Sequence, residues 1–122
     1  MAGSGGLICA AADLSERGAG VRFTVLRHGQ PQAAFAVRYD GIVRAYLNRC
    51  AHVPIELDWN PGEFFDWGGL YLVCSTHGAG YAPESGRCRT GPCAGRGLVP
   101  LSVEEREGAI YLIDESSELH YG

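Results

Sequence analysis

Two pairs of residues in the sequence combine a thiol with an imidazole at short spacing. Cys50 and His52 are two positions apart, and Cys74 and His77 are three positions apart. Thiolate sulfur and imidazole nitrogen suit zinc or an iron–sulfur centre, whereas calcium and magnesium prefer oxygen ligands. Each pair follows a run of residues that predicts a β-strand, so two loops leaving neighbouring strands can face each other. The sequence therefore predicts one metal site with two cysteine and two histidine ligands.

The order of these ligands along the chain bears on the kind of metal. Structural zinc sites more often take two cysteines from one knuckle and two histidines from one helix. Here each loop contributes one of each, and no helical pattern surrounds His77. In a two-iron cluster this mixed order allows both cysteines to bind one iron and both histidines the other, which is the Rieske arrangement. The alternatives are a zinc site and, more simply, two buried thiols with two unrelated histidines.

On these residues the stretch from about Val21 to Ile113 resembles the Rieske ferredoxin family, which includes the soluble ferredoxins of ring-hydroxylating dioxygenases and the small subunits of nitrite reductases. Gly78 follows the second histidine as in that family, and segments 85–87 and 91–92 are similar to its turn and its proline-bearing loop. The resemblance implies one [2Fe-2S] cluster per chain, covered by the loop that contains Pro92. It also implies that the cysteines bind the buried iron and the histidines the iron nearer the surface, with the ligand set Cys50, His52, Cys74 and His77.

The resemblance also bears on the reduction potential of the cluster. High-potential members join their two cluster loops through a disulfide, but Ile55 and Thr76 occupy the matching positions here. Those members also have a serine that donates a hydrogen bond to a bridging sulfide, and Ala79 stands in its place. Tyr81 is retained as a donor to a cysteine sulfur. Because a lost donor removes stabilisation of the more negative reduced state, we expect a potential at the low end of the Rieske range.

Composition sets broad limits on the class of protein. The chain has 122 residues, of which 46% are apolar and 20% charged, which is typical of one globular domain. The net charge of -4 excludes a broadly cationic nucleic-acid binder. All ten basic residues are arginine, which excludes lysine chemistry such as a Schiff base. No export signal is recognised and no apolar run approaches the roughly 20 residues of a membrane span, so we expect a cytoplasmic protein.

Short strands separated by turn signals dominate the rest of the sequence. Asp40-Gly41 and Glu107-Gly108 are two-residue loops of the kind that closes tight hairpins. This pattern favours an all-β sandwich or small barrel, and the resemblance implies a Rieske-like antiparallel version with an inserted cluster-binding subdomain. We expect one domain over residues 1–122, with the cluster-binding lobe and covering loop at about 48–97 and a flexible tail at 114–122. The expected strands are Val21–Arg27, Ala34–Tyr39, Ile42–Leu47, Leu70–Val73, Leu101–Arg106 and Ala109–Ile113, with single helical turns at 13–16 and 54–59.

Several further residues allow both a structural and a functional interpretation. Cys88 and Cys93 match no ligand position and are either buried thiols or a redox-active pair, whereas Cys9 is most simply a core residue. An aromatic group either packs the lobe onto the domain or forms a docking surface; it consists of Trp59, Phe64, Phe65 and Trp67. Three arginines near the cluster loops either steer an acidic partner or are solvated, namely Arg87, Arg89 and Arg96. Two histidines, His28 and His120, are expected to be solvated.

The resemblance implies a function in one-electron transfer. The chain would be the ferredoxin component that carries electrons from a reductase to an oxygenase or reductase, with redox proteins as its partners. No nucleic acid, membrane or small-molecule substrate is indicated, and no Ser-His-Asp signature indicates an enzyme. One alternative is a fixed electron-relay subunit of a nitrite reductase-like or oxygenase complex. The other is a zinc-binding module without redox function.

Overall fold

The computed structural model of the protein is built almost entirely of β-strands. It describes residues 6–49, 57, 62–65, 69, 71–74, 80–90, 97–113 and 118–119. The helical element within these residues is a single 3-10 turn, η2 (Ala11–Asp13), which starts before the turn expected at 13–16. The strands are β1 (Gly6–Ala10), β2 (Val21–Arg27), β3 (Gln30–Tyr39), β4 (Ile42–Leu47), β5 (Leu72–Val73), β6 (Gly80–Tyr81), β7 (Cys88–Thr90), β8 (Pro100–Leu101), β9 (Val103–Arg106), β10 (Ala109–Leu112) and β11 (Glu118–Leu119).

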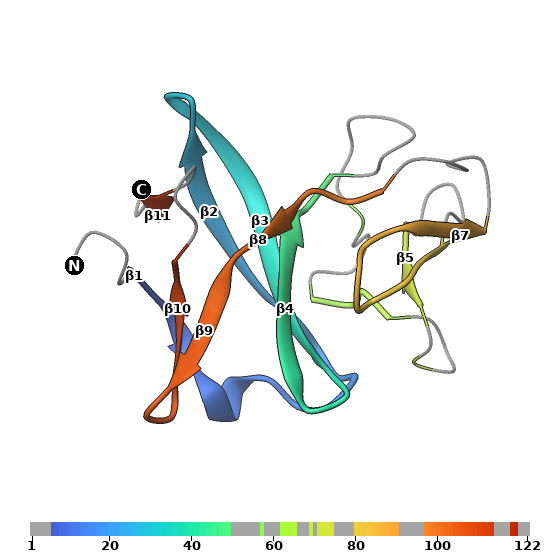
Figure 1. Ribbon diagram of the computed structural model, residues 1–122, viewed down its shortest axis with the longest axis horizontal. Coiled ribbons are helices and arrows are strands. Elements are labelled where there is room, and N and C mark those ends of the chain that lie inside the picture. The colour runs from blue at the N-terminus through green and yellow to red at the C-terminus, as the bar shows by residue number, and fades with distance from the viewer. Residues whose placement is uncertain are drawn as a thin grey trace.

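These strands form three antiparallel sheets, which confirms the all-β prediction. The sheets have the strand orders β11-β2-β3-β4-β8, β1-β10-β9 and β5-β6-β7. The first two enclose a shared core and make up what we call the body. The third sheet stands on the other side of β4 from β9 and β10 (Figure 1), and with the chain around it we call it the lobe. Two residues of the segment expected to be a tail form β11, which pairs with β2.

Strand β3 is buried on both of its faces. Four consecutive residues, 34–37, are fully buried, and they alternate between two cores as the two-residue period of a strand requires. Ala34 and Ala36 pack in the body core, whereas Phe35 and Val37 pack in the lobe core. The pair β3 and β4 is therefore a wall with the body on one side and the lobe on the other.

The three tight hairpins have the turn residues that their geometry demands. His28, Asp40 and Glu107 have φ values of +54°, +57° and +52°, and each is followed by a glycine at +76°. Two successive positive φ values are those of the type I′ turn, whose twist matches the flanking strands. The two hairpins predicted from Asp40-Gly41 and Glu107-Gly108 are confirmed. The third, at His28-Gly29, joins β2 to β3 and was not among the predicted hairpins.

Strand β3 also begins earlier than predicted, at Gln30 instead of Ala34, and it includes Pro31. Pro31 lies opposite Leu26 of β2, while the pairing of β3 with β4 begins only at Ala34. The missing N–H of the proline therefore interrupts no ladder with β4, and a proline is tolerated at such a position.

The segment predicted as one strand at 101–106 is two strands. Pro100 and Leu101 pair with β4, whereas Val103–Arg106 pair with β10, so the chain changes sheets at Ser102. This crossing joins the two sheets of the body. No helix in the described part of the chain combines the length and the apolar character needed to cross a bilayer.

Arg38 binds two segments to the wall: the connection between η2 and β2, and β9. Its guanidinium donates to both carboxylate oxygens of Glu105 at 2.9 and 3.1 Å, and to the carbonyl oxygen of Leu14 at 2.9 Å. Nearby, the Glu16 carboxylate accepts the backbone N–H groups of Asp40 and Gly41 at 2.6 and 2.7 Å. Hydrogen bonds from Arg38 lower the pKa of Glu105, and those backbone N–H groups lower the pKa of Glu16.

The substitution Glu105→Gln should weaken this fastening. A carboxyl group whose pKa is lowered by folding stabilises the protein above its unfolded pKa, and the contribution is lost as the pH falls through the folded pKa. We expect a loss of about 1 kcal/mol in the free energy of unfolding at pH 7, from a bidentate but partly solvated pair. The difference between variant and parent should shrink as the pH falls through the lowered pKa of Glu105, where the carboxylate of the parent becomes protonated.

Urea denaturation of both proteins at pH 7 and at acidic pH measures this difference. The matched control is Glu104→Gln, on the same strand, whose ion pair with Arg106 joins two side chains that are each about half exposed. A Glu105 variant no less stable than the Glu104 variant at pH 7 would contradict the proposed fastening.

Candidate metal centre

The four ligand candidates follow strands of the wall and the lobe. Cys74 comes directly after β5, is fully buried in the lobe core, and takes part in no disulfide. Cys50 stands three positions after the end of β4, and His77 three positions before β6. Cys50, His52 and His77 lie outside the described residues, so the ligand set as a whole stays a prediction.

Asn48 holds the chain just before Cys50. It is the buried polar residue of the described part of the chain, with 3% of its surface exposed. Its N–H donates to the carbonyl oxygen of Ala33, and its side-chain oxygen accepts the N–H of Leu57, both at 2.8 Å. One side chain thus links the end of β4 to a residue nine positions further along. Asn48 was not among the site residues predicted from the sequence, although an asparagine directly after a strand is a recognised turn signal.

Tyr81 lies in the lobe core together with Cys74. It is fully buried on the central strand β6, opposite Leu72 of β5 and Cys88 of β7. The structure therefore places Tyr81 in the same buried cluster as one ligand candidate. Its expected hydrogen bond to a cysteine sulfur stays a prediction, and Gly78 and Pro92 lie outside the described residues.

Phe64 packs the lobe onto the wall, which is one of the two interpretations considered for the aromatic group. Its ring stacks on Phe35 of β3 with centroids 3.9 Å apart and planes 12° from parallel. Gly20 makes this approach possible, because a Cβ there would lie 2.7 Å from the Phe64 ring. Phe65 stacks on Tyr39 at 6.3 Å. The other two members of the group, Trp59 and Trp67, lie outside the described residues.

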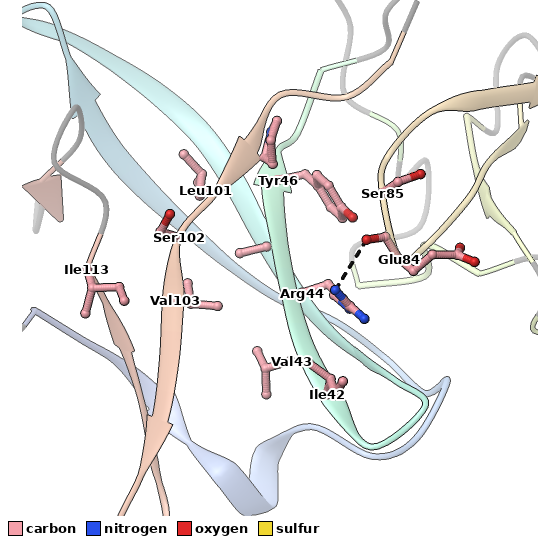
Figure 2. A pocket seen from close by; sticks show the side chains of 12 residues that line it. Ile42, Val43, Arg44, Tyr46, Glu84, Ser85, Leu101, Ser102, Val103 and Ile113 are labelled. Atoms are coloured by element: carbon pink, nitrogen blue, oxygen red, sulfur yellow. Dashed lines mark hydrogen bonds between the residues drawn. The ribbon is translucent and has the colours of Figure 1, made fainter.

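The turn at residues 82–86 is bound to β4 from the side of the lobe. The Tyr46 hydroxyl donates to the carbonyl oxygen of Pro83 at 2.6 Å, and Arg44 Nη1 donates to that of Glu84 at 3.3 Å (Figure 2). Burial raises the pKa of Tyr46 to about 12, so the hydroxyl keeps the proton that it donates. Gly86, with φ +76°, closes the turn, and a Cβ there would lie 2.7 Å from the Tyr46 ring. A glycine in the family-like segment 85–87 is thus required by the packing of Tyr46.

A cavity of about 430 Å³ opens beside this turn, between β4 and the segment of β8 and β9. Arg44 lies at its edge, and its Nε is buried with no hydrogen-bond partner among the described residues. The Glu84 carboxylate points away from the guanidinium (Figure 2). Cys74 does not line this cavity, which belongs to the seam between body and lobe and not to the candidate metal centre.

The remaining residues noted in the sequence have mixed outcomes. Arg87, Arg89 and His28 are exposed, and Cys9 packs against the body core as expected. Cys88 is half-buried against the lobe core and takes part in a disulfide bond, so its interpretation as a thiol is wrong. Arg96, Cys93 and His120 lie outside the described residues.

Comparison with known families agrees with this description of the fold. The family model described as Rieske [2Fe-2S] domain matches residues 6–107. Because this match covers most of the chain, the protein belongs to the Rieske [2Fe-2S] domain family. No curated protein matches the sequence at a significant level.

Solved structures of similar fold include two ferredoxins and one oxygenase. The ferredoxin of carbazole 1,9a-dioxygenase from Nocardioides aromaticivorans IC177 has a TM-score of 0.72 and 20% identity, over 92% of this chain and 99% of that one. The Sphingomonas yanoikuyae B1 ferredoxin has a TM-score of 0.67 and 22% identity, over 91% and 98%. The terminal oxygenase of the same Nocardioides dioxygenase has a TM-score of 0.72 and 22% identity, over 98% of this chain but 32% of that chain. At these identities the similarity shows the fold.

Of the four ligand candidates, the described residues include Cys74, and the surroundings of Cys74 fit a [2Fe-2S] cluster. A thiolate ligand must be free of disulfide bonds, and Cys74 takes part in none. The apolar lobe core around it limits the access of water, which is one of the means by which a protein sets the properties of a metal site. With imidazole as the second donor type, the set of four suits a two-iron cluster.

The substitution Asn48→Ala should loosen the chain before Cys50. It leaves the N–H of Leu57 buried without its acceptor, which costs roughly 1 to 3 kcal/mol in the free energy of unfolding. We expect this loss in urea denaturation, together with a lower iron content in the purified protein. The neighbouring substitution Arg49→Ala is the control, because Arg49 is exposed. An Asn48 variant with the stability and iron content of the Arg49 variant would show that the amide does not hold this loop.

The substitution Tyr46→Phe should detach the turn at 82–86 from β4 without changing the packing of the ring. The buried carbonyl of Pro83 loses its donor, so we expect a loss of roughly 1 to 3 kcal/mol in the free energy of unfolding. Tyr39→Phe is the matched control, because the contacts of Tyr39 with Phe65 and Arg17 are made by its ring. Equal stability of the two variants in urea denaturation would contradict this role of the Tyr46 hydroxyl.

Proposed function

We propose that the protein is a one-electron carrier whose Rieske [2Fe-2S] cluster is bound by Cys50, His52, Cys74 and His77. The observation that carries the proposal is the fully buried Cys74 thiol at the end of β5, which takes part in no disulfide, within a chain that belongs to the Rieske family. The other three ligands are assigned from the sequence motif. The bound cluster would supply one site that accepts and returns a single electron.

Residues of this chain hold the ligand loops in place and limit the access of water to the buried side of the predicted metal site. Asn48 fixes the backbone that leads to Cys50, and β5 delivers Cys74 into the lobe core. Tyr46 and Gly86 hold the neighbouring turn against β4. Neutral imidazoles at two ligand positions leave the site about two charge units less negative than four thiolates would, which favours the acceptance of an electron. A potential at the low end of the Rieske range, predicted from Ala79, is part of this proposal.

The expected partners are redox proteins: a reductase that donates electrons and an oxygenase or reductase that accepts them. One structure with a similar fold, with 24% identity, is described as a complex of reduced oxygenase and oxidized ferredoxin in carbazole 1,9a-dioxygenase. That description supports a ferredoxin-type role here. The cytoplasmic location is likewise carried forward as a prediction from the sequence.

A second candidate function is that of a fixed relay in a larger oxygenase or reductase complex. The observation in its favour is the match to a terminal oxygenase, of which the chain covers about a third. Size-exclusion chromatography and pull-down with candidate reductases and oxygenases distinguish the two roles. A free carrier elutes alone and reduces several acceptors in turn, whereas a fixed relay elutes with its catalytic partner.

The substitution Cys74→Ser should abolish binding of the cluster. We expect the parent, prepared anaerobically, to contain about two iron ions and about two sulfides per chain, which is the composition of a [2Fe-2S] cluster. After reduction it should give the EPR signal of a two-iron Rieske centre. The variant should lose both the cluster and this signal. Cys9→Ser is the matched control, because Cys9 is the other cysteine of the described residues outside a disulfide and lies in β1, in the body. A colourless parent with zinc and without iron would instead establish the zinc-module alternative.

A further inference from the structure

The sulfur of Cys88 is in the oxidised state. Cys88 begins β7, lies opposite Tyr81 and takes part in a disulfide bond. The sequence contains five cysteines, and Cys9 and Cys74 take part in no disulfide. The partner of Cys88 is therefore either Cys50 or Cys93.

The proposed ligand role of Cys50 decides between these two. A bond from Cys50 to Cys88 would remove one of the two thiolates that a Rieske cluster requires. We propose that Cys88 and Cys93 form a disulfide, which ties the loop containing Pro92 to β7. The inference goes beyond the proposed function and rests on it at one point, the exclusion of Cys50. It also gives a role to Cys88 and Cys93, which are not predicted ligands and whose presence packing in the core does not explain.

The base of the same loop is already fixed by the backbone. Arg87 and Gly97 form an antiparallel bridge, and the N–H of Leu98 donates to the carbonyl oxygen of Gly86 at 2.8 Å. A Cβ on Gly97 would lie 2.8 Å from that carbonyl oxygen, so the two segments approach closely. The two ends of this loop therefore lie close together. Within the loop, the proposed disulfide would close a smaller ring between residues 88 and 93. A cross-link of this kind reduces the conformations open to the loop.

The disulfide also removes two thiols that would compete for iron. With Cys88 and Cys93 joined, the thiols near the candidate centre are those of Cys50 and Cys74. Reduction of the bond takes two electrons and two protons from a dithiol, which itself becomes a disulfide, and gives two cysteine thiols. Formation runs through the same exchange in reverse, with a disulfide of the thioredoxin or glutathione type as the oxidant. In a reducing compartment such a bond is exchangeable, so its occupancy follows the local thiol–disulfide balance.

Tryptic mapping tests the connectivity directly, because arginines separate the three cysteines in question. Cleavage after Arg49, Arg87, Arg89 and Arg96 gives the peptides 50–87, 88–89 and 90–96. Anaerobically purified protein is denatured in iodoacetamide without reductant, digested, and analysed by mass spectrometry. We expect peptide 88–89 joined to peptide 90–96, two hydrogens lighter than their sum. Attachment of 88–89 to peptide 50–87, or alkylation of both Cys88 and Cys93, overturns the proposal.

Iron and sulfide analysis of the same sample separates this inference from the proposed function. Bound iron and sulfide with both cysteines alkylated would overturn the disulfide and leave the electron-carrier proposal intact. The joined peptides without iron or sulfide would do the opposite. A joined pair of 88–89 and 50–87 in protein without iron would overturn both.

The fastening role is tested by the rate at which iron is lost to a chelator. We expect Cys93→Ser to release iron to bathophenanthroline several-fold faster than the parent, with an unchanged EPR signal before the chelator is added. Cys9→Ser is the control and should release iron at the parental rate. Parent protein treated with a phosphine reductant provides a second measurement that does not depend on folding of a variant. If reduced parent and Cys93→Ser both release iron at the parental rate, the bond does not hold this loop.

Discussion

The two-sided burial of β3 is the constraint on which the rest of the structure depends. Alternate residues of one strand supply two separate cores, so that Ala34 and Ala36 face the body while Phe35 and Val37 face the lobe. In a strand, this division follows from the backbone alone, and a slip of one residue would exchange the two sets. The small side chains face the body and the larger ones face the lobe. The lobe core therefore depends on residues of β3, and the register of β3 against β2 and β4 sets the position of the lobe.

Hydrogen bonds hold the lobe close to the predicted ligand and covering segments. Asn48 acts where β4 ends, Tyr46 acts on the turn before β7, and the Arg87–Gly97 bridge closes the base of the next loop. Each contact joins the lobe to itself or to the wall close to a predicted ligand or covering segment. Buried hydrogen bonds of this kind stabilise modestly when made but cost more when one partner is missing. Such contacts define loop positions that an apolar core alone would leave variable.

Much of the fold could be predicted from the sequence, and the reasons for the failures are specific. Period-two alternation and the Asp-Gly and Glu-Gly turns located β2, β4, β10 and two hairpins, because these signals are local. The division of 101–106 at Ser102 could not be predicted, since it depends on the pairing of β8 with β4, a strand distant in sequence. The ligand candidates came from a motif, and of these the structure describes Cys74. Asn48 was missed because its role depends on the N–H of Leu57, a partner that no local pattern identifies.

The chemistry of sulfur in the lobe requires two oxidation states to be kept apart. Cys74 is a thiol outside any disulfide and Cys88 is in a disulfide, although both pack in or against the lobe core. Exchange between them would need direct contact of a thiolate with a disulfide sulfur. The order β5-β6-β7 places Cys74, directly after β5, and Cys88, on β7, on opposite sides of β6, and two strand spacings amount to about 10 Å. Tyr81 on β6 fills the row between Leu72 and Cys88, so its buried ring contributes to this separation as well as to the core. The central strand of this small sheet thus separates the thiol of Cys74, a predicted iron ligand, from the disulfide of Cys88.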